Sequence, residues 1–222
     1  MSDRTTRSND GIFISFEGTE GGGKSTQIQL LAERIKSLGR EVRSVREPGG
    51  TALGEEVRSL LKHGLHTGPM TAEAELMLMN ACRAQLVREV IRPALAAGDV
   101  VLCDRFADST IAYQGFGREM GWEVVRPIVQ LAVGDTWPNR TLLLSVPVEV
   151  SEARRAMRGA TTAGAVLRDR FEEEDRAFFH RVEAGFRAVA VSEPQRVRVI
   201  QATRTVPEVA AQIWNQVADL FN

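Results

Sequence analysis

The 222-residue sequence predicts an α/β protein with three layers, in which helices cover both faces of a five-stranded parallel sheet. Five short apolar runs alternate with helical patterns, as in repeated units of strand, helix and strand. These runs occupy residues 12–16, 42–45, 100–103, 141–146 and 197–200. The first run also leads directly into a glycine-rich turn and an amphipathic helix, which is a common beginning for such a sheet.

The helical patterns between the strands are bounded by ordinary start and stop signals. The first predicted helix spans residues 24–38 and ends at Gly39. The longest spans residues 71–97, with Thr71 as its N-cap and a kink or last stretch at Pro93. The other predicted helices cover residues 53–62, 123–133, 150–158 and 170–191, and a final helix begins at Pro207 as its first residue. In the loop after the second strand, Glu47-Pro48 is a candidate cis peptide bond.

Length and composition indicate a single domain of residues 11–222 after a flexible polar tail of residues 1–10. The 28 basic and 29 acidic residues nearly cancel, so nothing suggests nucleic acid or an anionic membrane as the main partner. No apolar run approaches the ~20 residues that span a bilayer. The tail also lacks the apolar centre of a signal peptide, and we therefore expect a cytoplasmic protein.

The strongest motif is G-x-x-x-x-G-K-S at residues 18–25. A strand, a glycine-rich turn and a helix in this order direct backbone N–H groups and a helix dipole at one point, which suits a polyphosphate. Lys24 would reach the β- and γ-phosphates, and the Ser25 hydroxyl would bind Mg²⁺. An ordinary glycine-rich loop is the alternative, which the flanking strand and helix disfavour. The predicted ATP-binding residues are Gly18, Gly21, Gly22, Gly23, Lys24, Ser25 and Thr26.

Charged residues follow the second and third strands, at the edge where the glycine-rich turn also lies. Asp104 ends an apolar run as in a Walker B segment, which predicts a Mg²⁺ site with Ser25; capping of the next helix is the alternative. Arg46 and Arg105 would hold a second, smaller phosphate by bidentate hydrogen bonds. A single arginine after a strand is usually solvated, but two at this edge favour a functional role.

A segment around residues 154–170 is the candidate lid, with small residues at 159–166 between arginines. Five arginines bracket these small residues, and any of them is a candidate to close over a transferring phosphoryl group and stabilise its charge. They are Arg154, Arg155, Arg158, Arg168 and Arg170. A solvated basic face paired with the glutamates at 172–174 explains any one of them equally well.

On the longest helix, Met79 and Arg83 are four residues apart and share a face. An apolar side chain and a planar cation one turn apart can hold a nucleobase by its face and its edge. Packing of this helix in the core accounts for Met79 equally well.

Together these motifs resemble the thymidylate kinase family over most of the chain. The resemblance rests on residues 16–26, 46–51, 83–85, 104–106 and 113–115 in this order. It implies the P-loop nucleotide kinase fold and transfer of the γ-phosphoryl group of ATP, with Mg²⁺, to dTMP. The product would be dTDP, a step in dTTP biosynthesis, and the enzyme would be a homodimer.

The resemblance also implies roles for individual residues. Lys24 and Ser25 would serve ATP and Mg²⁺, and Glu20 would meet the 3′-hydroxyl of the deoxyribose. The implied dTMP contacts are Arg46 and Arg105 at the phosphate, Arg83 and Met79 at the thymine, Thr110 and Gln114 in the rest of the pocket, and Tyr113 in the space of a 2′-hydroxyl.

Within the family, the chain resembles the branch that carries its catalytic arginine in the lid, which implies that Arg158, Arg168 or Arg170 lies near the transferring group. The phosphate loop offers Glu20 and no arginine, whereas the flanks of the lid are rich in arginine. Two features depart from the family pattern. Met79 stands where many members have an aromatic residue, and the lid has extra small residues at 161–166.

Three other functions stay open at this point. One is a kinase for another nucleoside monophosphate, and a second is a non-catalytic nucleotide sensor, which Lys24, Ser25, Asp104 and the lid arginines argue against. A third is a P-loop switch or motor. The sequence has neither an N-K-x-D segment for guanine nor a second domain or basic track for a motor.

Overall fold

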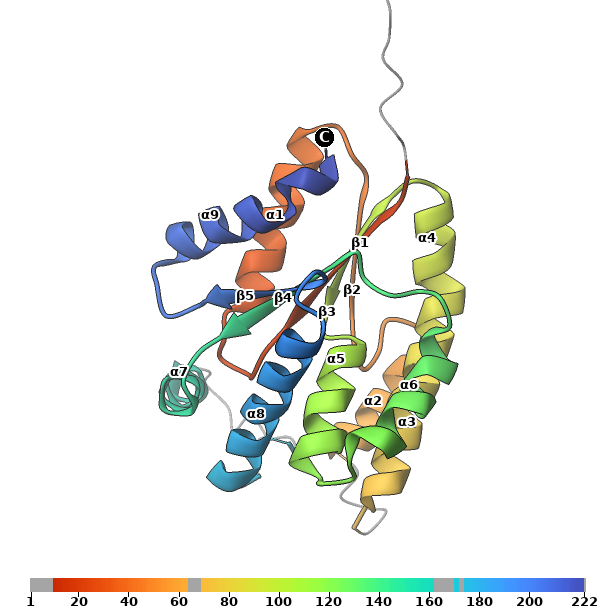
Figure 1. The fold of residues 1–222 in the computed structure, drawn as a ribbon, viewed down its shortest axis with the longest axis vertical. Coiled ribbons are helices and arrows are strands. Elements are labelled where there is room, and N and C mark those ends of the chain that lie inside the picture. The colour runs from red at the N-terminus through yellow and green to blue at the C-terminus, as the bar shows by residue number, and fades with distance from the viewer. Residues whose placement is uncertain (1–9, 64–68, 162–169, 172–173, 222) are drawn as a thin grey trace, which may run out of the picture.

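The computed structural model in Figure 1 describes residues 10–63, 69–161, 170–171 and 174–221. Its sheet contains five parallel strands, each within one residue of its predicted limits. They are β1 (Ile12–Glu17), β2 (Val42–Arg46), β3 (Val100–Asp104), β4 (Arg140–Ser145) and β5 (Val197–Gln201). Their spatial order is β2-β3-β1-β4-β5. Because the order reverses at β1, a ligand is expected beyond the carboxyl end of that strand.

Helices cover both faces of the sheet, which confirms the predicted α/β fold with three layers (Figure 1). The helices α1 (Lys24–Ser37) and α9 (Val206–Val217) pack together on one face. The opposite face carries a larger group, α3 (Ala72–Leu86), α5 (Ala107–Thr110), α6 (Trp122–Val133) and α8 (Arg176–Ser192). The helix α2 (Ala52–His63) packs against α3.

The two faces of the sheet follow from the alternation of side chains along β1. Ile12, Ile14 and Phe16 join the core under α1 and α9, whereas Phe13 joins the core on the opposite face. Successive residues of a strand point to opposite faces, so an almost wholly apolar strand is needed where helices cover both. Because its side chains are buried on both faces of the sheet, β1 is held firmly in position, and so is the start of the phosphate loop that follows it.

The long helix predicted at residues 71–97 is interrupted. It consists of α3, the π-helical segment η1 (Val87–Ile91) and α4 (Arg92–Ala96), with Pro93 in the first turn of α4. Proline has no N–H group and disrupts the preceding turn, which explains an irregular segment just before it. The predicted N-cap is confirmed, because the Thr71 hydroxyl accepts a hydrogen bond from the Ala74 N–H.

Two predicted boundaries near the lid are wrong. The helix α7 (Val148–Thr161) includes residues 159–161, which were expected to be irregular, while residues 162–169 lie outside the described part of the chain. The helix expected from residue 170 begins only at Arg176. Asp175 is its N-cap and accepts a hydrogen bond from the Phe178 N–H at 2.7 Å, so the cap decides the start.

Other differences are smaller. The short helix α5 and the π-helical segment η2 (Ile111–Gly117) were not predicted, because their residues are buried almost throughout and show no amphipathic period. The last helix starts one residue earlier than expected, at Val206, so Pro207 is its second residue. It is followed by the 3₁₀ segment η3 (Ala218–Phe221). The Glu47–Pro48 peptide bond is cis, as predicted.

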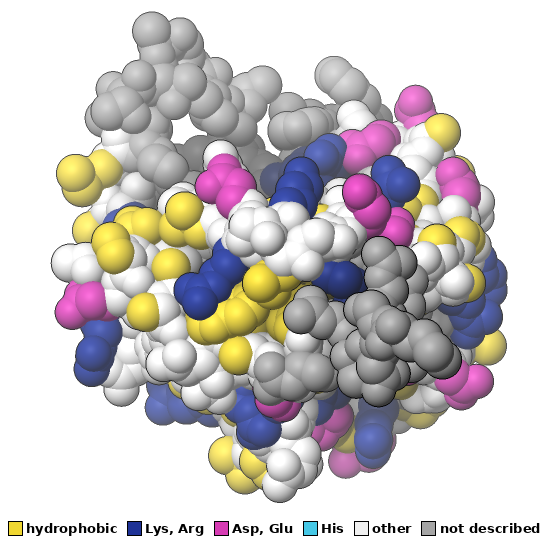
Figure 2. Space-filling model, turned by 90° about the horizontal axis from the view of Figure 1, so that it is seen from above, with side chains coloured by type: hydrophobic (Ala, Val, Ile, Leu, Met, Phe, Trp, Pro, Cys, Tyr) yellow, Lys and Arg dark blue, Asp and Glu magenta, His cyan; other side chains and the backbone are white. Residues whose placement is uncertain are grey.

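Charged side chains of both signs share the face of the molecule seen in Figure 2. On this face, Lys and Arg side chains are interspersed with Asp and Glu side chains. Within the described ranges, no helix has the length and apolar character needed to cross a membrane.

Candidate active site

The phosphate loop connects the end of β1 to the start of α1. Gly18 and Gly23 have φ angles of 123° and 84°, in the region that favours glycine. A Cβ atom on Gly18 would also lie 2.4 Å from the Leu144 carbonyl oxygen on β4. The Lys24 ammonium donates hydrogen bonds of 3.0 Å to the carbonyl oxygens of Gly18 and Thr19. These two hydrogen bonds hold the backbone of the loop in a turn around the Lys24 ammonium group.

Ser25 and Asp104 meet at the carboxyl edge of the sheet. The Ser25 hydroxyl donates a hydrogen bond of 3.2 Å to Oδ2 of Asp104. A hydroxyl and a carboxylate are oxygen ligands of the kind that Mg²⁺ prefers. The pair therefore fits the predicted metal site, beside the lysine that would neutralise phosphate charge.

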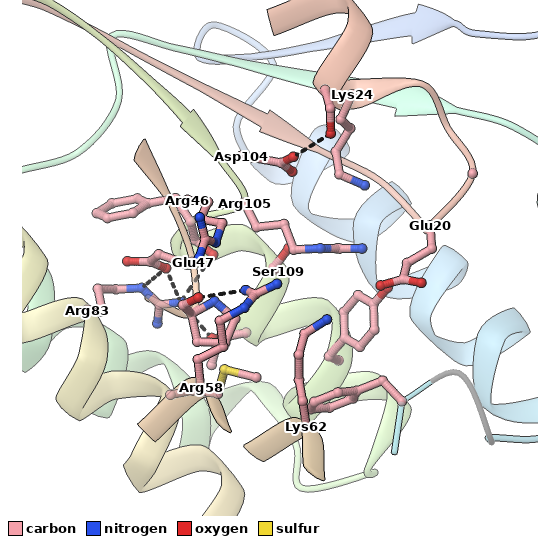
Figure 3. A pocket seen from close by; sticks show the side chains of 18 of the residues that line it. Glu20, Lys24, Arg46, Glu47, Arg58, Lys62, Arg83, Asp104, Arg105 and Ser109 are labelled. Carbon is pink, nitrogen blue, oxygen red and sulfur yellow. Dashed lines mark hydrogen bonds and ion pairs between the residues drawn. The ribbon is translucent and has the colours of Figure 1, made fainter. Parts of the chain in front are cut away.

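A cavity of about 370 Å³ opens in front of the phosphate loop. It collects most of the predicted site, namely Glu20, Gly21, Gly23, Lys24, Ser25, Thr26, Arg46, Met79, Arg83, Asp104, Arg105, Thr110, Tyr113 and Gln114. Six cations line it, Lys24, Arg46, Arg58, Lys62, Arg83 and Arg105, against the three carboxylates of Glu20, Glu47 and Asp104. Figure 3 shows Lys24, Lys62 and Arg105 extending into the same space from different elements. A nearly neutral protein thus concentrates positive charge where a phosphate would bind.

Arg105 follows β3 in an unusual backbone conformation, with φ of 69°. Its N–H donates to the Phe16 carbonyl oxygen at 2.9 Å, and its guanidinium donates to the Ser109 hydroxyl at 3.2 Å. The guanidinium also lies 5.0 Å from the centre of the Tyr113 ring. These contacts hold the Arg105 guanidinium beside the cavity through a hydroxyl and an aromatic ring.

Glu17 lies behind Arg105 and is fully buried. Its carboxyl accepts hydrogen bonds from the Phe106 N–H and the Ser109 hydroxyl. Burial, together with the nearby charge of Asp108, raises the pKa of Glu17 to about 8. Glu17 therefore fixes the backbone of Phe106, the residue after Arg105. It also fixes the Ser109 hydroxyl, which accepts the hydrogen bond from the Arg105 guanidinium.

Burial also shifts the pKa of two groups that line the cavity. It lowers the pKa of Lys24 to about 7, with the charge of Arg105 adding to the effect. It raises the pKa of Glu47 to about 7, against the opposing effect of Arg83. One oxygen of Glu47, Oε1, has no hydrogen-bond partner among the described residues. Both groups would gain from a ligand that supplies the missing charge or contact.

Arg83 on α3 is only 2% exposed and is held by four hydrogen bonds. Its Nε donates to Glu47 at 2.9 Å and its Nη1 to Asn80 at 2.8 Å. Its Nη2 donates to the Phe106 carbonyl oxygen at 3.2 Å and to the Thr110 hydroxyl at 2.9 Å. The guanidinium is thereby fixed in the cavity wall, together with the predicted Thr110.

Gln114 on η2 is anchored by Glu75, a residue of α3 with no exposed surface. The Gln114 side-chain nitrogen donates to Glu75 Oε1 at 2.7 Å. Arg118 donates to both oxygens of Glu75, at 3.2 and 3.1 Å, and Arg170 also donates to Oε2. A buried carboxylate thus joins the predicted pocket residue to Arg170, at the end of the candidate lid.

Of the three predicted lid arginines, Arg170 is the one whose side chain the structure describes. The side chain of Arg158 and the whole of Arg168 lie outside the described part of the chain. Arg170 is not among the residues that line the cavity; its guanidinium contacts Glu75 and the Leu61 carbonyl oxygen. Arg46 does line the cavity and forms an exposed ion pair of 2.8 Å with Glu55.

The sequence interpretation missed several residues of the cavity wall. Arg58 and Lys62 are four residues apart on α2, and this spacing on the predicted helix was a signal that could have identified them. Ser109 and the aromatic residues Phe171 and Phe179 reach the cavity from elements far apart in the sequence. Phe171 packs edge-to-face on Tyr113, with ring centres 6.2 Å apart. Met79 therefore shares a cavity with aromatic rings that no local pattern revealed.

A second cavity of about 460 Å³ lies on the other side of the phosphate loop. Arg154 on α7 lines it and donates to the carbonyl oxygens of Gly21 and Ala202. Gly21 and Gly23 of the loop and Thr26 in the first turn of α1 line both cavities. Two ligands could therefore meet at the loop from opposite sides.

Comparisons with known proteins agree on one family. The sequence model of thymidylate kinase matches residues 16–213. A thymidylate kinase of Synechococcus sp. (strain JA-2-3B'a(2-13)) is 48% identical over 93% of this chain and 94% of the relative. That of Syntrophotalea carbinolica is 44% identical over 95% and 97%. The crystal structure of thymidylate kinase from Ehrlichia chaffeensis has a TM-score of 0.73 and 30% identity, over 93% of this chain and 98% of that one.

Proposed function

Because the chain belongs to the thymidylate kinase family, we propose that it transfers the γ-phosphoryl group of ATP to dTMP and releases dTDP and ADP. The observation that carries this proposal is one cavity that contains both Lys24 of the phosphate loop and five further cations, Arg46, Arg58, Lys62, Arg83 and Arg105. A cluster of this kind is suited to a second phosphate beside that of ATP. The cavity on the other side of the loop would take the nucleoside part of ATP.

The acceptor phosphate would bind between Arg46 and Arg105, which follow adjacent strands. Arg46 and Asp104 are paired in the register of β2 and β3, and Arg105 comes next in the chain. Both guanidinium groups line the cavity. Planar guanidinium groups bind phosphate oxygens in pairs, which fixes the orientation as well as the position of the acceptor.

We propose Mg²⁺ as the metal cofactor, held by Ser25 and Asp104 and by oxygens of ATP. The bound ion would neutralise charge on the phosphate oxygens during transfer. The chain itself contributes position and charge: Lys24 neutralises the β- and γ-phosphates, and Arg105 holds the attacking phosphate of dTMP in line. An ionised phosphate is the acceptor, so the reaction requires no strong general base.

The rest of the acceptor pocket follows the family assignment. Glu20 would meet the 3′-hydroxyl, Met79 and Arg83 the thymine, and Thr110 and Gln114 the remaining nucleoside contacts. Tyr113 packs against the Arg105 guanidinium and would occupy the space of a 2′-hydroxyl. The residue near the transferring phosphoryl group would be Arg158 or Arg168. Arg170 is a weaker candidate because it is bound to Glu75.

Assays of ADP release test this proposal directly. Lys24→Ala and Arg105→Ala should abolish turnover of dTMP, while circular dichroism shows an unchanged fold. Arg43→Ala is a matched control, because Arg43 is an exposed arginine on the same strand as Arg46. Near-wild-type activity of either site variant, or selective use of a purine monophosphate by the wild-type protein, would contradict the proposal.

We also propose that the enzyme is a homodimer that uses the outer face of α6. Val124 and Leu131 are seven residues apart on this helix, share one face and are 50% and 80% exposed. Apolar side chains of this size at such spacing favour a covered helix face. Analytical ultracentrifugation of Leu131→Glu should give a monomer where the wild-type protein gives a dimer.

A further inference from the structure

We propose that Glu75 determines which bases the acceptor cavity accepts, by fixing the orientation of the Gln114 side-chain amide; this inference rests on the proposed function. Glu75 itself is not among the residues that line the cavity, and it is completely buried beneath Gln114. It is therefore a positioning residue, which acts on the base only through its neighbour.

The contact between the two residues leaves the amide little choice. The two ends of a glutamine amide are nearly equal in shape, but one end donates hydrogen bonds and the other accepts them. Among the described residues, the three groups that hydrogen-bond to the Glu75 carboxylate are all donors: the Gln114 nitrogen at 2.7 Å, the Arg118 guanidinium, and the Arg170 guanidinium. Reversing the amide would set its oxygen against an oxygen of the Glu75 carboxylate, which has no exposed surface. Gln114 must therefore turn its nitrogen to Glu75 and keep its oxygen for a ligand.

Arg83 supplies the complementary donor. Four of its five N–H groups are used by hydrogen bonds to described residues, at Glu47, Asn80, Phe106 and Thr110. One N–H on Nη1 is left for a ligand. Arg83 lies close to Gln114 because its Nη2 donates to the Thr110 hydroxyl, and Thr110 precedes Gln114 by four residues on continuous helical backbone.

In this proposal Arg83 offers a donor and Gln114 an acceptor to one ligand, since both residues line the same cavity. Thymine and uracil carry a carbonyl oxygen next to a ring N–H, which matches this pair. Cytosine carries an amino group next to a bare ring nitrogen, so both contacts would be reversed. A buried polar group that meets the wrong partner discriminates strongly between substrates, because it is left without a hydrogen bond.

Glu75→Gln tests this role with almost no change in shape. A glutamine at position 75 can present either its oxygen or its nitrogen, so Gln114 becomes able to reverse. We expect the ratio of kcat/KM for dTMP to that for dCMP to fall at least about tenfold, corresponding to about 1.4 kcal/mol. The value for dUMP should change in parallel with dTMP, because the two bases share this edge. An unchanged ratio between dTMP and dCMP would overturn the inference.

Arg118→Lys separates base selection from a merely structural role of Glu75. It removes the two-pronged contact with Glu75 but leaves the contact between Glu75 and Gln114. Thermal stability should fall, while the selectivity ratio stays within about twofold of wild type. A ratio that falls as far as in Glu75→Gln would mean that any disturbance of the cluster relaxes selectivity, and it would count against the proposal.

The remaining outcomes are also decisive. If Glu75→Gln does not fold, Gln114→Met removes both amide atoms and should lower the same ratio; an unchanged ratio would again overturn the inference. Wild-type protein that fails to use dTMP refutes the proposed function together with this inference. Active wild-type protein with variants of unchanged selectivity refutes the inference alone.

Discussion

The Ser25 hydroxyl and the Asp104 carboxylate lie 3.2 Å apart, although 79 positions separate the two residues in the chain. They meet because α1 begins just after β1, and Asp104 ends β3, the strand paired with β1. If this pair holds Mg²⁺, Ser25→Ala should raise the Mg²⁺ concentration for half-maximal activity by about tenfold, since one ligand oxygen is lost. ADP release measured over a range of Mg²⁺ concentrations at fixed ATP and dTMP checks this expectation.

Ser37→Ala is the matched control for that experiment. Ser37 lies at the other end of α1 and its exposed hydroxyl bonds only to the Arg34 carbonyl oxygen among the described contacts. Its Mg²⁺ requirement should equal that of the wild-type protein. A Ser25→Ala variant with an unaltered Mg²⁺ requirement would remove Ser25 from the proposed metal site.

Ser109 should affect dTMP more than ATP, because its hydroxyl accepts from Arg105 and donates to Glu17. Without it, Arg105 loses an anchor and the buried Glu17 loses a hydrogen bond. We expect Ser109→Ala to raise the KM for dTMP by about tenfold with little change in the KM for ATP. Steady-state kinetics with each substrate varied in turn measures both values. An equal rise in both KM values would indicate a general loss of structure instead. Ser192→Ala is the surface control, and both of its KM values should equal those of the wild-type protein.

The sequence predicted those parts of the fold and site that depend on local patterns. Strand limits followed from apolar runs, and the loop around Lys24 followed from glycine spacing, because both are encoded by neighbouring residues. Phe171, Ser109 and the contact between Glu75 and Gln114 could not be predicted in the same way. Each depends on side chains from separate elements that meet only after the helices pack on the sheet. The sequence predicts helix from residue 170, but α8 begins only at Arg176, because Asp175 within this polar stretch provides the cap.

The lowered pKa of Lys24 predicts proton uptake when ATP binds. Burial lowers this pKa to about 7 in the free protein, so at pH 8 most of the Lys24 side chains are neutral. Phosphate charges favour the ammonium form and raise the pKa, so binding should take up close to one proton at pH 8. At pH 6 the lysine is already mostly protonated and uptake should nearly disappear. Calorimetry with a non-hydrolysable ATP analogue, in buffers of different ionisation enthalpy, measures the number of protons.

Lys24→Arg is the control for proton uptake, because arginine stays charged throughout this pH range. The variant should show no uptake from this position at either pH. If the wild-type protein and Lys24→Arg take up the same number of protons at pH 8, the protons come from another group and Lys24 is charged before ATP arrives.

Glu20 should separate the two substrates although it lies within the phosphate loop. Its side chain lines the acceptor cavity, while its backbone carbonyl oxygen accepts a hydrogen bond from the Ser151 hydroxyl on α7. The next residue, Gly21, is held by Arg154. Because backbone contacts hold the loop, Glu20→Ala should leave its shape and the affinity for ATP unchanged within about twofold. The KM for dTMP should rise about tenfold through loss of the contact with the 3′-hydroxyl.

Glu20→Gln distinguishes that contact from a general effect of charge in the cavity. A glutamine keeps the length and an acceptor oxygen for the 3′-hydroxyl, so its KM for dTMP should lie closer to wild type than that of Glu20→Ala. Analogues that lack the 3′-hydroxyl sharpen the comparison, because they should bind the wild-type protein and Glu20→Ala about equally. An equal loss of ATP and dTMP binding in Glu20→Ala would instead mean that the side chain maintains the loop itself, and Glu20 would not be an acceptor contact.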